Sequence, residues 1–146
     1  MDFATGVYLL ELERGHLLRL GVWAAVSLLA GVLLVPLVGR LAPASQGFWR
    51  HFGIQSGAWG AVDLIIVAVA WNGLALRNLA GAIALDRFLW LNIGLDVGYA
   101  MVGLTLIAFG ARKPRRVGLV GAGAAIVAQG VALAILDAQL SAYIVR

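Results

Sequence analysis

Four long apolar runs constrain the fold of this chain more than any other feature. Spanning ~30 Å of hydrocarbon takes about 20 helical residues, and four runs reach that length, at residues 17–38, 52–74, 89–110 and 117–145. Inside a bilayer only helices and closed barrels satisfy every backbone hydrogen bond. The runs therefore predict an all-α fold, an integral membrane four-helix bundle that forms a single transmembrane domain over residues 1–146.

The composition agrees with this prediction and excludes several kinds of chemistry. Hydrophobic residues make up 62% of the chain and the mean hydropathy is +0.96, whereas a soluble domain is about half apolar. The chain has no cysteine, which excludes disulfides and thiolate metal sites. We attribute the net charge of +4 to Lys and Arg at span ends, and we expect no nucleic-acid partner.

The N-terminal segment does not match a standard signal peptide. Residues 1–16 contain three acidic residues and no basic residue before Arg14, whereas a signal peptide starts with basic residues before a short apolar core. For residues 2–14 two alternatives stay open, a short amphipathic helix or a disordered tail.

The basic residues give only a small bias in membrane orientation. Five of them fall on the side of the termini and the second connection, and six fall in the first and third connections. Residues 111–116, ARKPRR, concentrate four of the six, and cytoplasmic loops are rich in Lys and Arg. We therefore expect a bacterial cytoplasmic (inner) membrane with both termini outside.

Two polar pairs suggest an internal repeat. Gln55 and Asp63 in the second run are spaced like Gln129 and Asp137 in the fourth, and the offset is 74 residues (129 − 55 and 137 − 63). Two similar two-helix halves of this kind would share one orientation in the membrane. Because the match rests on few residues, duplication and coincidence both remain open.

Three acidic residues, Asp63, Asp96 and Asp137, lie inside the predicted spans. An aspartate at the centre of a membrane helix costs about 2.5–3.5 kcal/mol on insertion scales, and lipid offers it no hydrogen bond. These side chains must therefore face one another, a cavity or a ligand. The residues that we expect to orient or satisfy them are Gln55, Asn92, Tyr99 and Gln129.

The buried acids have a structural and a functional interpretation. In the first, Arg19, the only basic residue inside a run, forms an ion pair with one acid, and the amides bind the others across helix interfaces. In the second, the three acids line a cation or proton site. We interpret His16 and His51 as solvated, and the sequence shows no strong metal motif and predicts no cofactor.

Spans two to four resemble a family of small bacterial four-span membrane proteins of unknown function. The motifs that carry the resemblance are Trp59-Gly60 before Asp63, Asn92-x-x-x-Asp96-x-x-Tyr99, and Gln129-Gly130 followed by Asp137. The resemblance implies the four-span fold, and it implies no activity.

Three classes of function follow from this pattern. The first is a non-enzymatic membrane protein whose polar core handles a cation, a proton or a small molecule, with lipid and further copies of the chain as partners. The second is a structural or accessory subunit that packs within a larger membrane complex through glycine-rich faces. The third is a membrane enzyme that acts on lipid, for which Asp137 would be the only candidate.

Overall fold

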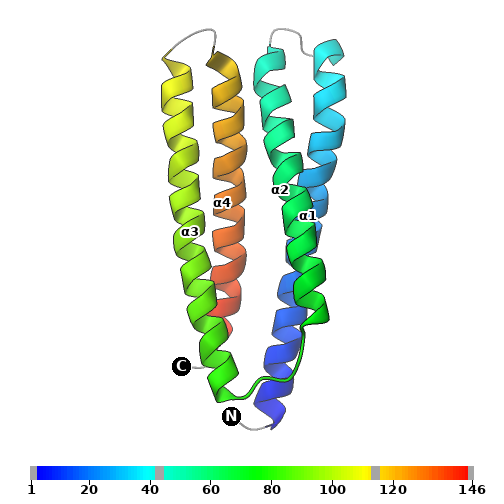
Figure 1. The fold of residues 1–146 in the computed structure, drawn as a ribbon, viewed down its shortest axis with the longest axis vertical. Coiled ribbons are helices and arrows are strands. Elements are labelled where there is room, and N and C mark those ends of the chain that lie inside the picture. Colours follow the sequence, from blue (N-terminus) through cyan, green and yellow to red (C-terminus); the bar gives the residue numbers. More distant parts are fainter. Residues whose placement is uncertain (1–2, 42–44, 113–115, 145–146) are drawn as a thin grey trace.

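The computed structural model describes residues 3–41, 45–112 and 116–144, and these residues form four long α-helices. The helices are α1 (Phe3–Leu41), α2 (Gln46–Asn72), α3 (Leu79–Ala111) and α4 (Val117–Tyr143). They alternate in direction, so both chain ends lie at one end of the bundle (Figure 1). We call this the terminal end, and we call the opposite end, where α1 meets α2 and α3 meets α4, the turn end.

All four helices are long and apolar enough to cross a membrane. The predicted all-α four-helix fold is therefore confirmed. Three basic residues of the orientation argument, Lys113, Arg115 and Arg146, lie outside the described residues.

The outer surface of the bundle is apolar, unlike that of a soluble bundle. Large apolar side chains such as Ile65, Val69 and Leu95 are 63–70% exposed. The largest fully buried side chains are instead Asp63 and Ser141. An apolar exterior with the polar side chains buried among apolar ones is what a lipid environment favours, because only the interior can hydrogen-bond polar groups.

Three of the four helices begin before the spans that the sequence predicted. The first helix is continuous from Phe3, so residues 3–14 are helical, as one of the two alternatives held, but as part of α1 rather than as a separate segment or a disordered tail. The second spans Gln46–Asn72 rather than residues 52–74, and the third begins at Leu79 rather than 89. The predictions stopped at charged residues, but Asp86 continues α3 because its carboxylate accepts a hydrogen bond from Ser141 of α4 at 2.7 Å.

Two helical hairpins build the bundle. The main contacts join α1 to α2 and α3 to α4, while α2 and α4 hold the hairpins together. Glycines allow the closest approaches: a Cβ on Gly31 would lie 2.5 Å from Gly57 Cα, and a Cβ on Gly123 would lie 2.5 Å from Gly103 O. Small residues at such crossings let the backbones of membrane helices meet. The pairing of the helices fits two halves, whereas duplication itself remains a prediction.

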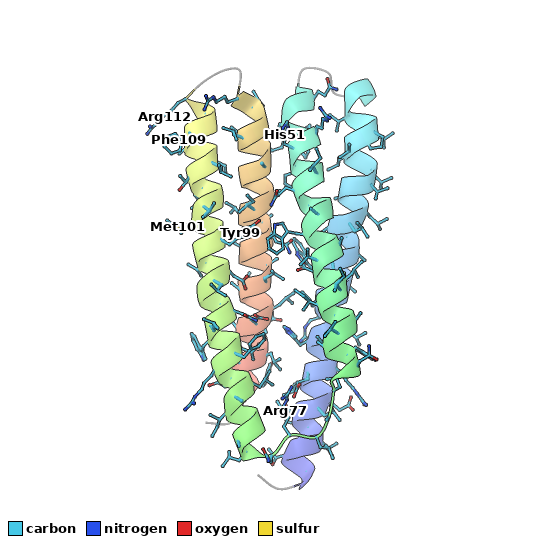
Figure 2. The ribbon with its side chains drawn as sticks, in the orientation of Figure 1. His51, Arg77, Tyr99, Met101, Phe109 and Arg112 are labelled. Atoms are coloured by element: carbon cyan, nitrogen blue, oxygen red, sulfur yellow. The ribbon has the colours of Figure 1, made fainter. Side chains whose placement is uncertain are left out.

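The connection at the terminal end, residues 73–78, is short and leads into a capped helix. Asn78 precedes α3, and its side-chain oxygen accepts a hydrogen bond from the Gly81 backbone N–H at 2.9 Å. This is the usual way to satisfy a donor left free in the first helical turn. The cap fixes where α3 starts and brings Arg77 close to α1 (Figure 2).

Candidate functional site

Polar side chains from all four helices face the interior of the bundle. We call this set the polar seam, and its members are His16 and Trp23 from α1, Asp63 from α2, Asn92 and Asp96 from α3, and Gln129 and Asp137 from α4. Five of the seven are among the residues that the sequence predicted. His16 and Trp23 were not among them.

The centre of the seam is a hydrogen-bonded chain across three helices. Trp23 Nε1 donates to Gln129 Oε1 at 2.9 Å, and Gln129 Nε2 donates to Asp63 Oδ2. Because an indole N–H can only donate, it fixes the amide so that its NH₂ group faces the carboxyl. Asp63 is only 1% exposed, and this single chain therefore orients a fully buried acid.

A second acid lies closer to the terminal end, opposite a histidine. Asp137 Oδ1 is 3.4 Å from His16 Nε2, and the Asn92 side chain also hydrogen-bonds Asp137. The imidazole of His16 is buried, and its Nδ1 has no hydrogen-bond partner among the described residues. Asp137 follows Gln129 by eight residues on α4, which places it about 12 Å further along the helix axis.

Asp96 connects these two parts of the seam electrostatically. Its carboxyl interacts through space with both Asp137 and Asp63, and it receives no hydrogen bond from another described residue. It is half-buried on α3, and a Cβ on either flanking glycine, Gly94 or Gly98, would meet nothing within 4 Å. Asp96 is thus the least constrained of the three acids and the one that links the other two.

Gln55 and Tyr99 form a separate polar bridge between α2 and α3. Gln55 Nε2 donates to the Tyr99 hydroxyl at 2.8 Å. The Tyr99 ring packs edge-on against Trp59, with ring centroids 5.0 Å apart, and Figure 2 places it at mid-height between the hairpins. These predicted residues therefore satisfy each other rather than an aspartate.

The predicted ion pair of Arg19 with a buried acid is not present. Arg19 is exposed and forms no ion pair with a described acidic residue. The basic side chain that faces Asp137 is His16, about one helical turn earlier on α1. The interpretation of His16 as solvated is therefore wrong. Helix α1 turns His16 inward and leaves Arg19 on the outer side.

A bidentate ion pair at the terminal end was also missed. Arg77 Nε and Nη2 donate to the two carboxylate oxygens of Glu13 at 2.6 and 2.8 Å. Glu13 is 5% exposed, and its hydrogen bond raises the pKa of Arg77, which lies in the connection outside the spans. This clasp ties the N-terminal part of α1 to the connection between α2 and α3.

One sequence signal could have revealed these residues. Glu13, His16, Leu20, Ala24 and Ser27 follow one another at intervals of three or four and are all buried. That spacing marks a single helical face, and Trp23 adjoins it. The face was missed because the first span was taken to start at residue 17.

The seam has acids and one imidazole but no metal-ligand set. Within the part of the chain that the structure describes, no three His, Cys, Asp or Glu residues converge as they would around a metal ion. The groups present can instead take up, hold and release protons, and donate or accept hydrogen bonds.

Comparison with known proteins gives a family match that covers most of the chain. No curated protein and no solved structure matches. Residues 19–138 match the model of a family of unknown function, DUF6992, and this range contains all three seam aspartates and Gln129. The chain therefore belongs to DUF6992, a family of unknown function.

Proposed function

We propose that this chain is a non-enzymatic membrane protein that handles protons within the bilayer through its polar seam. The observation that carries the proposal is that Asp63 and Asp137 are both buried inside the bundle, where Asp63 is bound by Gln129 and Asp137 faces His16 at 3.4 Å. Intramembrane acids of this kind are rare, because lipid penalises them, and they mark ion and proton pathways.

A proton fits the seam better than a metal ion or a larger solute. A cation would need several ligands around one point, and the described residues offer no such group. Two grooves of the described bundle, one between α1 and α4 and one between α1 and α2, are lined by no acidic side chain, so neither provides a cavity for a solute at the acids. A proton needs only single groups that bind it and hydrogen bonds that pass it on.

The charged groups in and around the seam support the proposal that it binds and releases protons. The seam contains three carboxyls and one imidazole, and the charges that act on His16 from outside the seam belong to Arg19 and Glu13. Glu13 is already paired with Arg77. The net charge of the seam is therefore set by how many protons its own groups hold, and interacting groups of this kind bind protons as a unit.

The acids of the seam lie at different depths along the helices. His16 and Asp137 lie toward the terminal end, and Asp63 with Gln129 lies nearer the middle of the helices, about 12 Å away along α4. Asp96 interacts with the acids at both levels. We propose that protons enter at His16 and Asp137 and reach Asp63 through Asp96.

A complete pathway requires more than one copy of the chain. Four helices of this size enclose little volume, and towards the turn end the interior contacts that we described are glycine crossings and the Gln55–Tyr99 bridge. We therefore propose a homo-oligomer in which the seams of neighbouring copies lie close together. Mass measurement of the detergent-solubilised protein tests this: a strictly monomeric protein that still conducts protons would contradict it.

The flux experiment uses protein reconstituted into liposomes that contain a pH-sensitive dye. We expect the wild type to dissipate a pH gradient, and we expect Asp63→Asn, Asp96→Asn and Asp137→Asn each to slow this at least tenfold. Glu11→Gln is the matched control, because Glu11 is an exposed carboxylate that pairs only with Arg14 on the same helix. Wild-type flux in all three aspartate variants would refute the proposal.

A structural or accessory role is the second candidate, and one observation favours it. The Trp23–Gln129–Asp63 chain and the Gln55–Tyr99 pair satisfy several polar groups internally, as expected for polar contacts that hold a bundle together. Co-purification with one stoichiometric membrane partner, together with no proton flux, would favour this role.

We further propose that the termini face the outside of a bacterial cytoplasmic (inner) membrane, because cytoplasmic loops are rich in Lys and Arg. The chain has no native cysteine, so single cysteines report orientation cleanly. A cysteine at Ala75 should react with an impermeant maleimide added to intact cells, and one at Gln46 should not. The reverse pattern would invert the assignment.

A further inference from the structure

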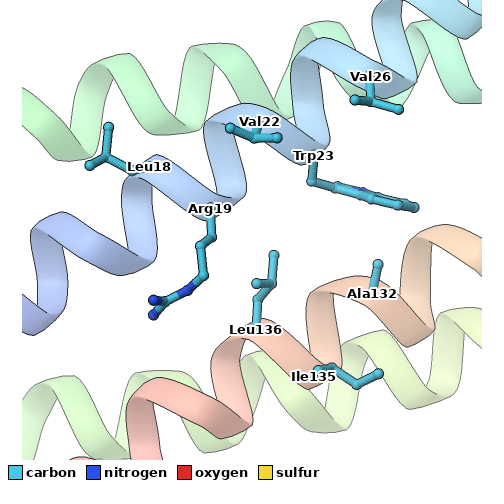
Figure 3. Close-up of a pocket in the computed structure, with 8 residues that line it drawn as sticks. All are labelled: Leu18, Arg19, Val22, Trp23, Val26, Ala132, Ile135 and Leu136. Atoms are coloured by element: carbon cyan, nitrogen blue, oxygen red, sulfur yellow. The ribbon is translucent and has the colours of Figure 1, made fainter.

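An apolar groove runs between α1 and α4 on the outer surface of the bundle. It has a volume of about 530 Å³, and its walls include Val22 and Val26 from α1 and Ile135 and Leu136 from α4 (Figure 3). From Leu18 to Val26 it follows about 12 Å of α1. The groove faces the side of the molecule that lipid would cover, because its wall residues Val22 and Ile135 are themselves exposed.

One cationic group, that of Arg19, lies at this groove. Arg19 is among its lining residues, and its Nη1 lies close to Gly15, one turn nearer the N-terminus. The guanidinium therefore extends along α1 toward the terminal end, as long basic side chains do when they reach for the membrane surface. Figure 3 shows the side chain leaving the apolar walls in that direction.

The neighbouring acids are already paired with other bases. Glu11 pairs with Arg14 at 2.6 Å, Glu13 with Arg77 at 2.6 Å, and Asp137 faces His16. No described acidic residue remains for Arg19 within ion-pair distance. Within the described residues, this cation at the edge of an apolar, lipid-facing groove therefore has no acidic ion-pair partner.

We propose that this groove binds an anionic phospholipid, with its phosphate on Arg19 and one acyl chain along the apolar walls. The planar guanidinium matches a phosphate with paired N–H donors, and basic sites between membrane helices bind anionic head groups in this way. A second copy of the chain is the alternative occupant, and the experiment below separates it from lipid. This inference does not depend on proton handling.

Trp23 makes the site measurable. Its indole lines the groove while its N–H donates to Gln129, so a lipid chain in the groove contacts the ring. Bromine atoms on an acyl chain quench a tryptophan that they touch. The contribution of Trp23 is obtained as the difference between the wild type and Trp23→Phe, because the chain has five tryptophans.

The experiment compares brominated phosphatidylglycerol with brominated phosphatidylcholine, each titrated into nanodiscs of unlabelled phosphatidylcholine. We expect phosphatidylglycerol to quench Trp23 at about fivefold lower mole fraction, the factor for one arginine near an anionic head group. Arg19→Gln should bring the two lipids to equal quenching, and Arg87→Gln, which removes an exposed arginine from α3, should leave the preference unchanged.

A second variant provides an independent test if the Arg19→Gln protein does not insert into the membrane. Ala132 lines the groove from α4, and Ala132→Phe should fill it and reduce quenching by both lipids. Equal quenching by the two lipids in the wild type would overturn the proposal, as would a preference that survives Arg19→Gln. Absence of quenching by either lipid, with disulfide dimers formed through Val22→Cys, would assign the groove to a second copy instead.

Discussion

His16 Nε2 lies 3.4 Å from Asp137 Oδ1, so an imidazole of α1 faces a carboxyl of α4 inside the apolar bundle. Nδ1 on the other side of the ring has no partner among the described residues. The contact joins two helices that otherwise touch over a small area. It also places the only histidine of the seam at the acid nearest the terminal end.

The first prediction concerns the tautomer of His16. Because Nε2 faces the Asp137 carboxylate and Nδ1 has no hydrogen-bond partner among the described residues, the neutral ring should carry its proton on Nε2. ¹⁵N chemical shifts of histidine-labelled protein in lipid measure this, and His51→Gln removes the second histidine signal. Asp137→Leu should abolish the preference, whereas an Nδ1–H tautomer in the wild type would contradict the contact.

The second prediction concerns the amide that orients Asp63. Gln129→Leu leaves the Asp63 carboxyl and the Trp23 N–H without their partner, which should cost about 1–3 kcal/mol for an unsatisfied buried group. Asp63→Leu combined with Gln129→Leu should recover part of this loss, because both polar partners are then gone. Unfolding in detergent and denaturant measures the change, and strictly additive losses would show that the two side chains do not interact.

The third prediction concerns the Glu13–Arg77 clasp. Arg77→Gln leaves Glu13 buried without a cation, and loss of one partner of a buried pair costs about 3–5 kcal/mol. Because Arg77 is 33% exposed, we expect the lower end of that range or less. The hydrogen bond with Glu13 raises the pKa of Arg77. The stabilisation that the Arg77 charge contributes is therefore complete at pH values below its unfolded-state pKa, and it is lost as the pH rises through its folded-state pKa. Glu13→Gln with Arg77→Gln should cost less than Arg77→Gln alone, and equal costs would argue against the pair.

The fourth prediction concerns the crossing of α1 and α2. A Cβ on Gly31 would lie 2.5 Å from Gly57 Cα, so Gly31→Ala forces the helices apart and should cost about 1–3 kcal/mol, as overpacking does. Gly98→Ala is the matched control, since a Cβ there meets nothing within 4 Å. Equal stability of the two variants would place the crossing elsewhere.

The sequence predicted the acids well and their partners poorly. Asp63, Asp96 and Asp137 had to face the interior because lipid cannot solvate them, and this holds whatever the rotation of each helix. The partners depend on that rotation, which packing at glycine crossings such as Gly31 with Gly57 determines. The local pattern therefore gave no way to choose His16 over Arg19 as the base opposite Asp137.

The predicted span ends differ from the observed helix ends for a related reason. A charge usually marks the end of a membrane span, so Glu13 and Asp86 were placed outside the first and third spans. Each is instead held by a residue distant in sequence, Arg77 and Ser141 respectively. Such partners compensate a charge within a helix, and no window of neighbouring residues contains them.

Proton binding by the seam carboxyls tests the central claim most directly. Infrared spectra of the protein in lipid, recorded across pH with isotope-labelled aspartate, follow the C=O bands of protonated carboxyls. Because Asp63 and Asp137 both act electrostatically on Asp96, we expect Asp63→Asn and Asp137→Asn each to shift the titration of Asp96, and Asp86→Asn, outside the seam, to leave it in place. Seam aspartates that exchange no protons across pH, or an Asp96 titration that is identical with and without Asp63 and Asp137, would contradict the account.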